Sequence, residues 1–283
     1  MKLGLNDVTV CTADCSTPAL AALALKRSMA QCSFADAVLF TDGTMQSDEF
    51  RTVRIEPLKS RDEYSRFVLQ ELIHSIRTPY ALVIQWDGYV LEPKAWTPDF
   101  LRYDWIGAKW PYHKDGMTVG NGGFSLRSRK LMEITASPIF QLQPGVNEDE
   151  LVCRTYRTGL ERDFQIRFAP EEIADRFSYE NSIPNAPTFG FHALFNMWRH
   201  VDDEDMVGLS EQFTPQILRS GAFIMLLDNY VRMRRFRPLL ALYSRWKREC
   251  TQQEIRSQIL AASRNQEFTD TFVGFCEALG PFT

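Results

Sequence analysis

The segment VIQWDGYVLEP places a single aspartate, Asp87, at the end of an apolar stretch. The β-prone residues 81–84 predict a buried strand, so Asp87 is expected at the sheet edge, where an open α/β sheet keeps its binding crevice. A carboxylate there is a ligand for a hard divalent cation shared with a substrate diphosphate. A strand-terminal aspartate also caps the following turn, so its position alone leaves both interpretations open.

Three further segments carry groups of the kind used at binding sites. The glycines of GNGGF, at 120–124, let a backbone approach a sugar or phosphate closely, or they simply make a tight turn. In NED, Asn147 is an expected helix N-cap, and Glu148 and Asp149 either begin that helix or supply a general base. His192, in FGFH, is either a ligand or a hydrogen-bonded structural residue.

The elements that must position these groups alternate between strands and helices, which predicts an α/β layer architecture. Strands are predicted at 8–13, 37–42, 52–58, 81–84, the start of 125–134 and QIRFAP (165–170), and helices at 18–29, 61–76 and 147–158. After the acidic run DDED the chain reads as helical from residue 214 onward. We therefore expect one domain over residues 1–205 and an α-helical region over residues 206–283.

The composition is that of a folded protein without a strong charge bias. Of its 283 residues 45% are hydrophobic and 24% charged, and the formal net charge of -4 argues against a nucleic-acid partner. The six cysteines are scattered without zinc-site spacing, so we expect free thiols in a reducing compartment. Because the sequence shows neither a secretory signal nor a long apolar run, a cytoplasmic location is expected.

The order of these segments resembles that of GT-A glycosyltransferases, in which a DxD-type motif ends a strand, a glycine-rich loop follows, an xED motif supplies the base and a late histidine completes the metal site. The phrases IQWDGYVLEPKAW, VGNGGFSLRSRKL, NED and FGFH are similar, more closely, to a bacterial family of glycosyltransferase-like proteins catalogued as a domain of unknown function. The resemblance spans roughly residues 64–192. It implies a GT-A-like, Rossmann-type mixed sheet flanked by helices, with a small C-terminal α-helical appendage.

The resemblance also implies roles for particular residues. Asp87 stands at the last acid of the DxD-type motif, where it would bind, together with His192, the divalent cation (Mn²⁺ or Mg²⁺) that bridges the donor diphosphate. Gln85 replaces the first acid and offers an oxygen without charge, so metal dependence stays open. Asp149 would be the general base of an inverting reaction, with Glu148 orienting it or contacting the acceptor.

The donor site implied by the resemblance draws on several segments. The residues expected to contact the nucleotide sugar are Thr12, Lys59, Gln85, Trp86, Asp87, Gly122 and Gly123. The expected partners are a nucleotide sugar, UDP-sugar first, and a glycan or lipid-linked glycan acceptor in bacterial surface polysaccharide synthesis. One alternative is a non-catalytic nucleotide-sugar-binding or scaffolding protein on the same fold, which Gln85 favours. The other is a sugar nucleotidyltransferase, although the N-terminal segment VCTADCSTPAL lacks that class's glycine- and lysine-rich signature.

Two further groups of residues have open interpretations. The aromatic residues Trp86, Trp105, Trp110 and Tyr112 are either an acceptor platform for sugar faces or core residues. The basic stretch of the helical region either contacts an anionic membrane surface peripherally, or is a solvated face or the cover of an acidic neighbour. Its cations are Arg232, Arg234, Arg235, Arg237, Arg245, Lys247 and Arg248.

Overall fold

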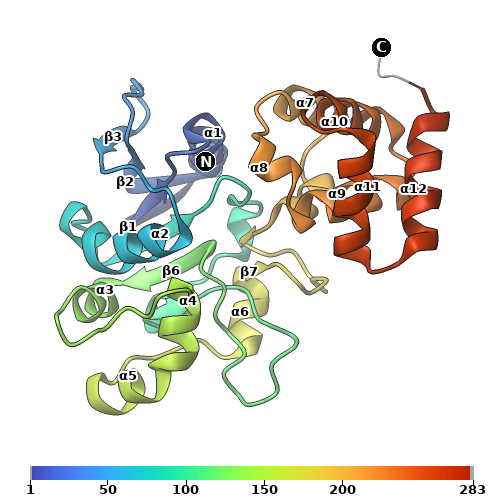
Figure 1. The fold of residues 1–283 in the computed structure, drawn as a ribbon. Coiled ribbons are helices and arrows are strands. Elements are labelled where there is room, and N and C mark those ends of the chain that lie inside the picture. The colour runs from blue at the N-terminus through green and yellow to red at the C-terminus, as the bar shows by residue number, and fades with distance from the viewer. Residues whose placement is uncertain (1, 281–283) are drawn as a thin grey trace. The chain divides into compact units, whose positions relative to one another are not determined.

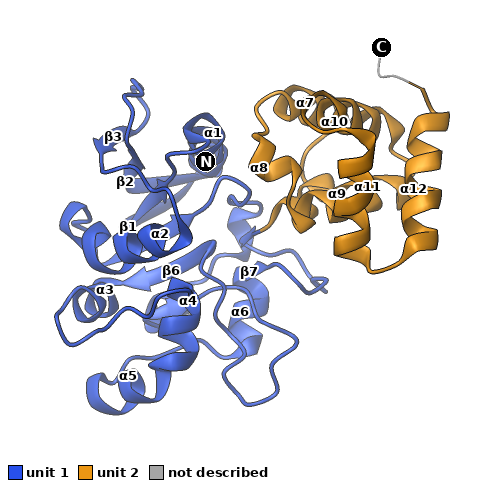
Figure 2. Ribbon diagram, in the orientation of Figure 1, with its two compact units in different colours: residues 1–192 blue, residues 193–283 orange. Residues whose placement is uncertain are grey.

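The computed structural model describes residues 2–280, and its contacts divide the chain into two compact units, Met1–His192 and Ala193–Thr283 (Figure 2). The sequence placed the boundary after residue 205. The contact division falls earlier because the 3₁₀ segment Leu194–Arg199 packs on α9 (Gly221–Arg232) of the second unit.

The first unit is built on a six-stranded mixed sheet in the order β3-β2-β1-β4-β6-β5 (Figure 1). Its strands are β1 (Leu3–Ala13), β2 (Cys32–Thr41), β3 (Arg51–Arg54), β4 (Tyr80–Ile84), β5 (Trp105–Ile106) and β6 (Phe124–Ser128). The first four strands are parallel, whereas β6 runs antiparallel to both β4 and β5. The predicted α/β fold with a mixed sheet is confirmed.

Helices flank this sheet. They are α1 (Pro18–Gln31), α2 (Arg61–Arg66), α3 (Arg129–Thr135), α4 (Glu148–Glu150), α5 (Arg157–Phe164) and α6 (Glu171–Phe177), with short 3₁₀ turns at Pro93–Ala95 and Pro98–Arg102. Phe40 and Val83 of the sheet pack with Phe67 and Met132 in one buried cluster, while α1 packs on β1 and β2. The residues of β1 from Val8 onward are all buried, so both faces of this strand are covered.

The helix predicted at 61–76 consists of three consecutive segments. The α-helix α2 begins where the Ser60 hydroxyl accepts a hydrogen bond from the Glu63 amide, a side-chain N-cap. A π-helical segment, Phe67–Glu71, and a 3₁₀ segment, Leu72–Ser75, continue it. The apolar periodicity therefore identified the buried face correctly, but not the changes of helix type along it.

The strand predicted in QIRFAP, at 165–170, is wrong. Gln165 adopts a left-handed conformation with φ 55° and ends α5, so the chain turns at the start of the predicted strand. Only Phe168 forms a bridge, and it pairs with Trp105 of the two-residue strand β5. So short a neighbour offers little edge for a longer strand to extend along.

The second unit is helical throughout its described residues. Beyond the 3₁₀ segment and α9, its helices are α7 (Asp203–Ser210), α8 (Pro215–Leu218), α10 (Phe236–Glu249), α11 (Gln252–Ser263) and α12 (Gln266–Ala278). Thr251 and Glu254 form a capping box at the start of α11. The predicted helical C-terminal region is confirmed. Within residues 2–280, no helix combines the length and the apolar character needed to cross a membrane.

The basic stretch at 232–248 is paired with acids of its own unit. The ion pairs are Arg232–Asp228, Arg235–Asp203, Arg237–Glu204, Arg245–Glu249, Lys247–Glu277 and Arg248–Glu211. Exposed pairs of this kind contribute only about 0–1 kcal/mol each to stability, but they reduce the unbalanced positive charge that an anionic membrane would attract. The structure favours an acidic neighbour as the partner of this stretch, and membrane contact stays a prediction.

Candidate functional site

The residues that follow β4 lie against the glycine turn that precedes β6. Ile84 pairs with Phe124 in the antiparallel register, so the chain leaving β4 lies beside the chain entering β6. The Gln85 amide donates a hydrogen bond of 2.8 Å to the Gly123 carbonyl. The segment that contains Asp87 is therefore held beside GNGGF, although the two are far apart in the sequence.

A second, two-stranded sheet brings His192 to the same place. Its strands, β7 (Ser178–Tyr179) and β8 (Gly190–Phe191), are parallel and in register. Glu180 and His192 are the residues that directly follow these strands, so they lie side by side. The His192 amide donates to the Tyr179 carbonyl at 3.0 Å, which fixes the backbone at this point.

His192 is the centre of a group of polar side chains that we call the histidine cluster (Gln85, Asp87, Glu180 and His192). Its Nε2 lies 3.1 Å from Gln85 Oε1 and 3.4 Å from Asp87 Oδ1, and its Nδ1 lies 3.1 Å from Glu180 Oε1. Burial by itself lowers the pKa of His192, but the carboxylates of Asp87 and Glu180 outweigh it and raise this pKa to about 10. The raised pKa favours the protonated imidazole, which donates from Nε2 toward Gln85 and Asp87 and from Nδ1 toward Glu180.

On the other side of the glycine turn, two acids share one arginine in what we call the acid cluster (Arg127, Glu148 and Asp149). Asp149 accepts hydrogen bonds from the amides of Gly122 at 3.0 Å and Glu150 at 2.8 Å. Glu148 Oε1 accepts from Arg127 Nη2 at 3.3 Å, and both side chains are buried. Burial and the neighbouring Glu148 raise the pKa of Asp149 to about 7, although the two amides and Arg127 oppose this. A carboxyl group with this pKa is suited to accept a proton near neutral pH.

Glycine is required at both positions of the turn because side chains pack directly against its backbone. A Cβ on Gly122 would lie 2.3 Å from Glu148 Oε1, and a Cβ on Gly123 would lie 2.1 Å from His192 Nε2. Neither glycine has a positive φ. The close approach expected from GNGGF is present, but the groups that approach are side chains of the two clusters.

The remaining residues predicted to bind the donor lie in different surroundings. Thr12 is buried near the carboxyl end of β1, and its Oγ1 has no hydrogen-bond partner within the described part of the chain. A buried hydroxyl without a partner costs free energy, so a ligand oxygen or nitrogen there would be favourable. Trp86 is partly buried beside Asp87. Lys59 is exposed ahead of α2, where its backbone amide donates to the Glu63 carboxylate.

The aromatic residues divide between core and surface. Trp105 is fully buried and its Nε1 donates to the Gly120 carbonyl at 2.8 Å. Trp110 is also buried, with its ring where a Cβ on Gly120 would stand. Tyr112, by contrast, is 61% exposed. Core packing is therefore the role of the two tryptophans, and only Tyr112 and Trp86 stay available to a sugar.

Sequence reasoning missed three residues of the site. Arg127 lies inside FSLRSRK, where it could be read as an ordinary charge on a strand of alternating exposure, but it is almost fully buried. Glu180 ends the phrase DRFSYE, and nothing in the sequence distinguished it from the other acids of that segment. Tyr64, read only as part of a helix face, accepts a hydrogen bond of 3.2 Å from Gln85 Nε2 through its hydroxyl. The sequence offered no signal for Arg127, because FSLRS alternates apolar and polar residues as a half-exposed strand does.

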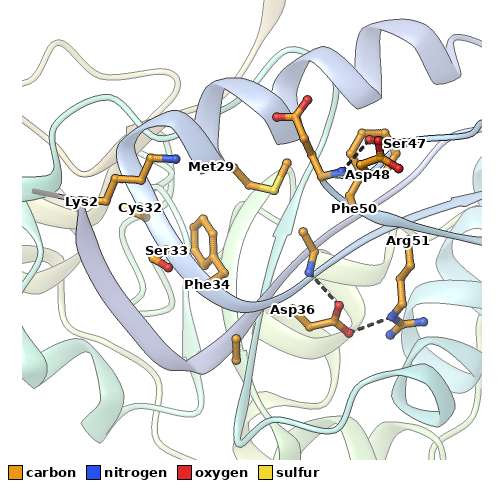
Figure 3. A pocket seen from close by; sticks show the side chains of 13 residues that line it. Lys2, Met29, Cys32, Ser33, Phe34, Asp36, Ser47, Asp48, Phe50 and Arg51 are labelled. Carbon is orange, nitrogen blue, oxygen red and sulfur yellow. Dashed lines mark hydrogen bonds and ion pairs between the residues drawn. The ribbon is translucent and has the colours of Figure 1, made fainter.

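A hollow of about 630 Å³ lies elsewhere on the first unit (Figure 3). It is lined by the start of β2 and the segment entering β3, so it lies at the amino edge of the parallel strands, opposite to Asp87. Two of its charged groups bond to each other, since Arg51 Nε donates to Asp36 Oδ2 at 2.8 Å. The hollow contributes no residue to either cluster.

Three atoms of the histidine cluster fit a divalent cation by their chemistry. They are Gln85 Oε1, Asp87 Oδ1 and His192 Nε2, an amide oxygen and a carboxylate oxygen that lie 3.1 Å and 3.4 Å from an imidazole nitrogen. Over residues 2–280, no group of three or more His, Cys, Asp and Glu side chains is arranged as a metal site. The donor set therefore depends on Gln85, which brings no charge.

The first unit is thus an α/β domain with a polar site at the carboxyl edge of its parallel strands. Residues 47–192, just over half of the chain, match the model of the family described as "Protein of unknown function (DUF5672)", and the chain belongs to this family. No curated protein matches the chain.

Solved structures of glycosyltransferases are similar to this chain in fold. The galactosyltransferase LgtC, in complex with donor and acceptor sugar analogues, has 12% identity and a TM-score of 0.37, over 65% of this chain and 86% of that chain. TarS residues 1–349 from S. aureus have 9% identity and a TM-score of 0.39, over 98% and 89%. The mannosyltransferase PcManGT from Pyrobaculum calidifontis, in complex with GDP-Man and Mn²⁺, has 10% identity and a TM-score of 0.41, over 96% and 86%. At such identities the function must be inferred from the residues of this chain.

Proposed function

We propose that this chain is a nucleotide-sugar-dependent glycosyltransferase that inverts the configuration of the anomeric carbon. The observation that carries the proposal is the state of Asp149, whose carboxyl is held by the Gly122 amide and has a pKa raised to about 7. The same turn presents Asp87 and His192 on its other side, through Gly123. A base and a diphosphate-binding group on opposite sides of one short turn match the needs of a direct displacement.

In the proposed reaction, an acceptor hydroxyl oxygen forms a bond to the anomeric carbon of the donor. The bond from that carbon to the diphosphate oxygen breaks, and its electron pair leaves with the nucleoside diphosphate. The hydroxyl proton goes to Asp149, while Glu148, paired with Arg127, orients the base. Because attack occurs opposite to the leaving group, a single displacement inverts the anomeric centre. A positioned base of this kind contributes about 10²- to 10⁴-fold.

A divalent cation, Mn²⁺ or Mg²⁺, bound here would neutralise the charge that develops on the leaving diphosphate. Gln85, Asp87 and His192 would hold it, since Gln85 Oε1 and Asp87 Oδ1 both lie close to His192 Nε2. His192 has to release its Nε2 proton to become a ligand, so the proton and the cation compete for the same nitrogen. We propose that metal affinity is weak for this reason and because Gln85 carries no charge.

The proposed donor is a nucleotide sugar, UDP-sugar first, and the proposed acceptor is a glycan or lipid-linked glycan of a bacterial surface polysaccharide. The unpartnered Thr12 hydroxyl supports a donor contact at the end of β1. Trp86, Gly122 and Gly123 border the same space by their positions next to Asp87 and the turn. Lys59 is not included, because its ammonium contacts neither cluster.

A second candidate function is a nucleotide-sugar-binding protein without catalysis. Gln85 supports it, since the uncharged amide at this position replaces an acid of the DxD-type motif. Measured turnover with any donor would eliminate this candidate.

The experiment is a thermal-shift screen of the purified chain against nucleoside diphosphates and nucleotide sugars, each with Mn²⁺, with Mg²⁺ and with a chelator. A ligand that binds only the native state raises apparent stability, by about 2.7 kcal/mol at a hundred times its Kd. We expect one nucleotide to shift the transition, and this shift to disappear in Asp87→Ala. The matched control, Asp99→Ala, removes an exposed acid of the same unit and keeps the shift. If no nucleotide shifts the transition, the proposed donor site is wrong.

The stereochemical outcome is tested on the product. Proton NMR of the first-formed glycoside reports the anomeric coupling before any equilibration, and inversion is expected. Retention would remove Asp149 from its role as base.

A further inference from the structure

Arg127 is a buried cation that contacts both the glycine turn and Glu148. It belongs to β6 and is 2% exposed, with its guanidinium stacked over the Trp105 ring at 4.3 Å from the centroid. Its Nε donates to Ser125 Oγ at 3.0 Å, and its Nη2 donates to the Gly122 carbonyl and to Glu148 Oε1, both at 3.3 Å. Its Nη1 is buried and has no hydrogen-bond partner among residues 2–280.

These contacts fix the backbone of the turn from one side. The Gly122 carbonyl accepts hydrogen bonds from Arg127 and from Ser125 Oγ, the second at 2.9 Å. The preceding Gly120 carbonyl accepts from Trp105 Nε1. With its carbonyl oxygens held inward, the peptide chain presents the Gly122 amide to Asp149 at 3.0 Å.

We propose that Arg127 is the positioning residue of the reaction: its guanidinium holds the Gly122 carbonyl and the Glu148 carboxylate together, so that the Gly122 amide fixes Asp149 in the place of the base. This inference rests on the proposed function and adds a residue to it. A lysine at this position would keep the positive charge but could not bond Ser125, Gly122 and Glu148 at once, because only a guanidinium has donors in a rigid fork.

Arg127 also lowers the pKa of Asp149, against the effects of burial and of Glu148. The groups that face Asp149 are Glu148 in the same helix, Arg127 from β6, Cys153 from the π-helical segment Leu151–Thr155 that follows α4, and Tyr112 from the loop after β5. Arg127 is the only lasting cation among these four groups, since an arginine does not lose its proton in proteins. Removing it would leave two neighbouring carboxylates without a counter-charge.

The Gly122 amide gives a readout that does not depend on turnover. Because this amide donates to Asp149 Oδ2, its ¹⁵N and ¹H chemical shifts follow the protonation of that carboxyl. We expect the wild-type amide to titrate with a midpoint near pH 7. In Arg127→Met the midpoint should rise by up to about one pH unit, because the guanidinium that lowers the pKa of Asp149 is gone. In Arg127→Lys it should stay within a few tenths of the wild-type value.

Turnover separates the charge of Arg127 from its geometry. Arg127→Lys should keep the pH profile and the donor KM but lower kcat by about tenfold or more, since a loosely held base is less effective. Arg127→Met should lower kcat further and move the acid limb of the profile upward. The control Arg129→Met removes a cation that bonds Ile76 and Glu133 outside the turn, and should change neither quantity.

Each result bears on the inference. If Arg127→Met does not fold, the double variant Arg127→Met/Glu148→Gln is titrated against Glu148→Gln, so that the difference between the two midpoints reports the loss of Arg127 alone. The inference is overturned by wild-type kcat in Arg127→Lys together with an unmoved Gly122 titration, either in Arg127→Met relative to wild type or in the double variant relative to Glu148→Gln. If no variant and no wild-type sample transfers sugar, but the Gly122 midpoint moves as expected, the positioning role of Arg127 holds and the proposed function fails.

Discussion

Each side of the Gly122–Gly123 turn has two carboxylates and one basic side chain, but the proton is exchanged by a different group on each side. In the acid cluster two carboxylates, Glu148 and Asp149, face one arginine. In the histidine cluster two carboxylates, Asp87 and Glu180, face one histidine.

The difference lies in which group exchanges the proton. Arg127 keeps its proton, so the surplus negative charge of the acid cluster raises the pKa of a carboxyl, that of Asp149, to about 7. His192 is free to bind a proton, so the same surplus raises the pKa of the imidazole to about 10. We therefore propose the acid cluster as the source of a base near neutral pH, and the histidine cluster as the source of a cation or, after loss of its proton, of a metal ligand. The identity of the cation decides the chemistry of each side.

The strongest test of the acid cluster is Asp149→Asn. Without a basic carboxylate, sugar transfer should fall by about 10²- to 10⁴-fold, while the nucleotide-induced thermal shift stays. Asp163→Asn, an exposed acid of the same unit, is the matched control and should transfer at the wild-type rate. Unchanged transfer in Asp149→Asn would mean that this side of the turn provides no base.

The second test removes the partner of Arg127. Glu148→Gln leaves a buried guanidinium without a counter-charge, which should lower the free energy of unfolding in urea by about 3–5 kcal/mol. Glu133→Gln removes the partner of Arg129 in an exposed pair and should cost less than about 1 kcal/mol. Equal effects of the two changes would show that the acid cluster is not a buried ion pair in solution.

The third test concerns the space between the clusters. Gly123→Ala places a methyl group 2.1 Å from the expected position of His192 Nε2, so overpacking should cost about 1–3 kcal/mol of stability and weaken nucleotide binding. Gly159→Ala, where a Cβ meets nothing within 4 Å and the residue lies in α5, should be neutral or add up to about 1 kcal/mol. A Gly123→Ala protein with wild-type stability would contradict the packing of His192 on the turn.

The smallest expected effect is the pH dependence of the base. Because Asp149 must be deprotonated to accept a proton and its pKa is raised to about 7, kcat/KM should rise with pH and level off above 7. Well below pH 7 the fall should approach about tenfold per pH unit. Below pH 7 the profile should follow the titration of Asp149 alone. A profile that already levels off below pH 5 would contradict the raised pKa of this carboxyl.

The same shift has a consequence for stability with a definite sign. The folded-state pKa of Asp149 lies above the ordinary value of about 3.9, so its contribution to stability is present at low pH and is lost as the pH rises through about 7. Asp149→Asn should therefore gain stability relative to wild type between pH 5 and pH 8. Denaturation of both proteins over this range measures the difference.

The sequence by itself determined the elements and the groups that reach the sheet edge. Apolar runs such as that of residues 81–84 identified buried strands because burial on both faces requires continuous hydrophobicity. The resemblance to a known family identified Asp87, Asp149 and His192 as the residues to examine. The local pattern predicted a strand in QIRFAP wrongly, because a strand also needs a partner to pair with. The neighbouring strand β5 is only two residues long.

Only the tertiary structure decided which groups meet. The register of β4 with β6, and of β7 with β8, brings Gln85 and His192 to the same turn from positions far apart in the chain. Arg127 could not be separated from other surface charges by its sequence, because its burial depends on Trp105 and Glu148. The pKa values of a carboxyl and an imidazole depend on such neighbours, and a linear sequence does not contain the distances that set them.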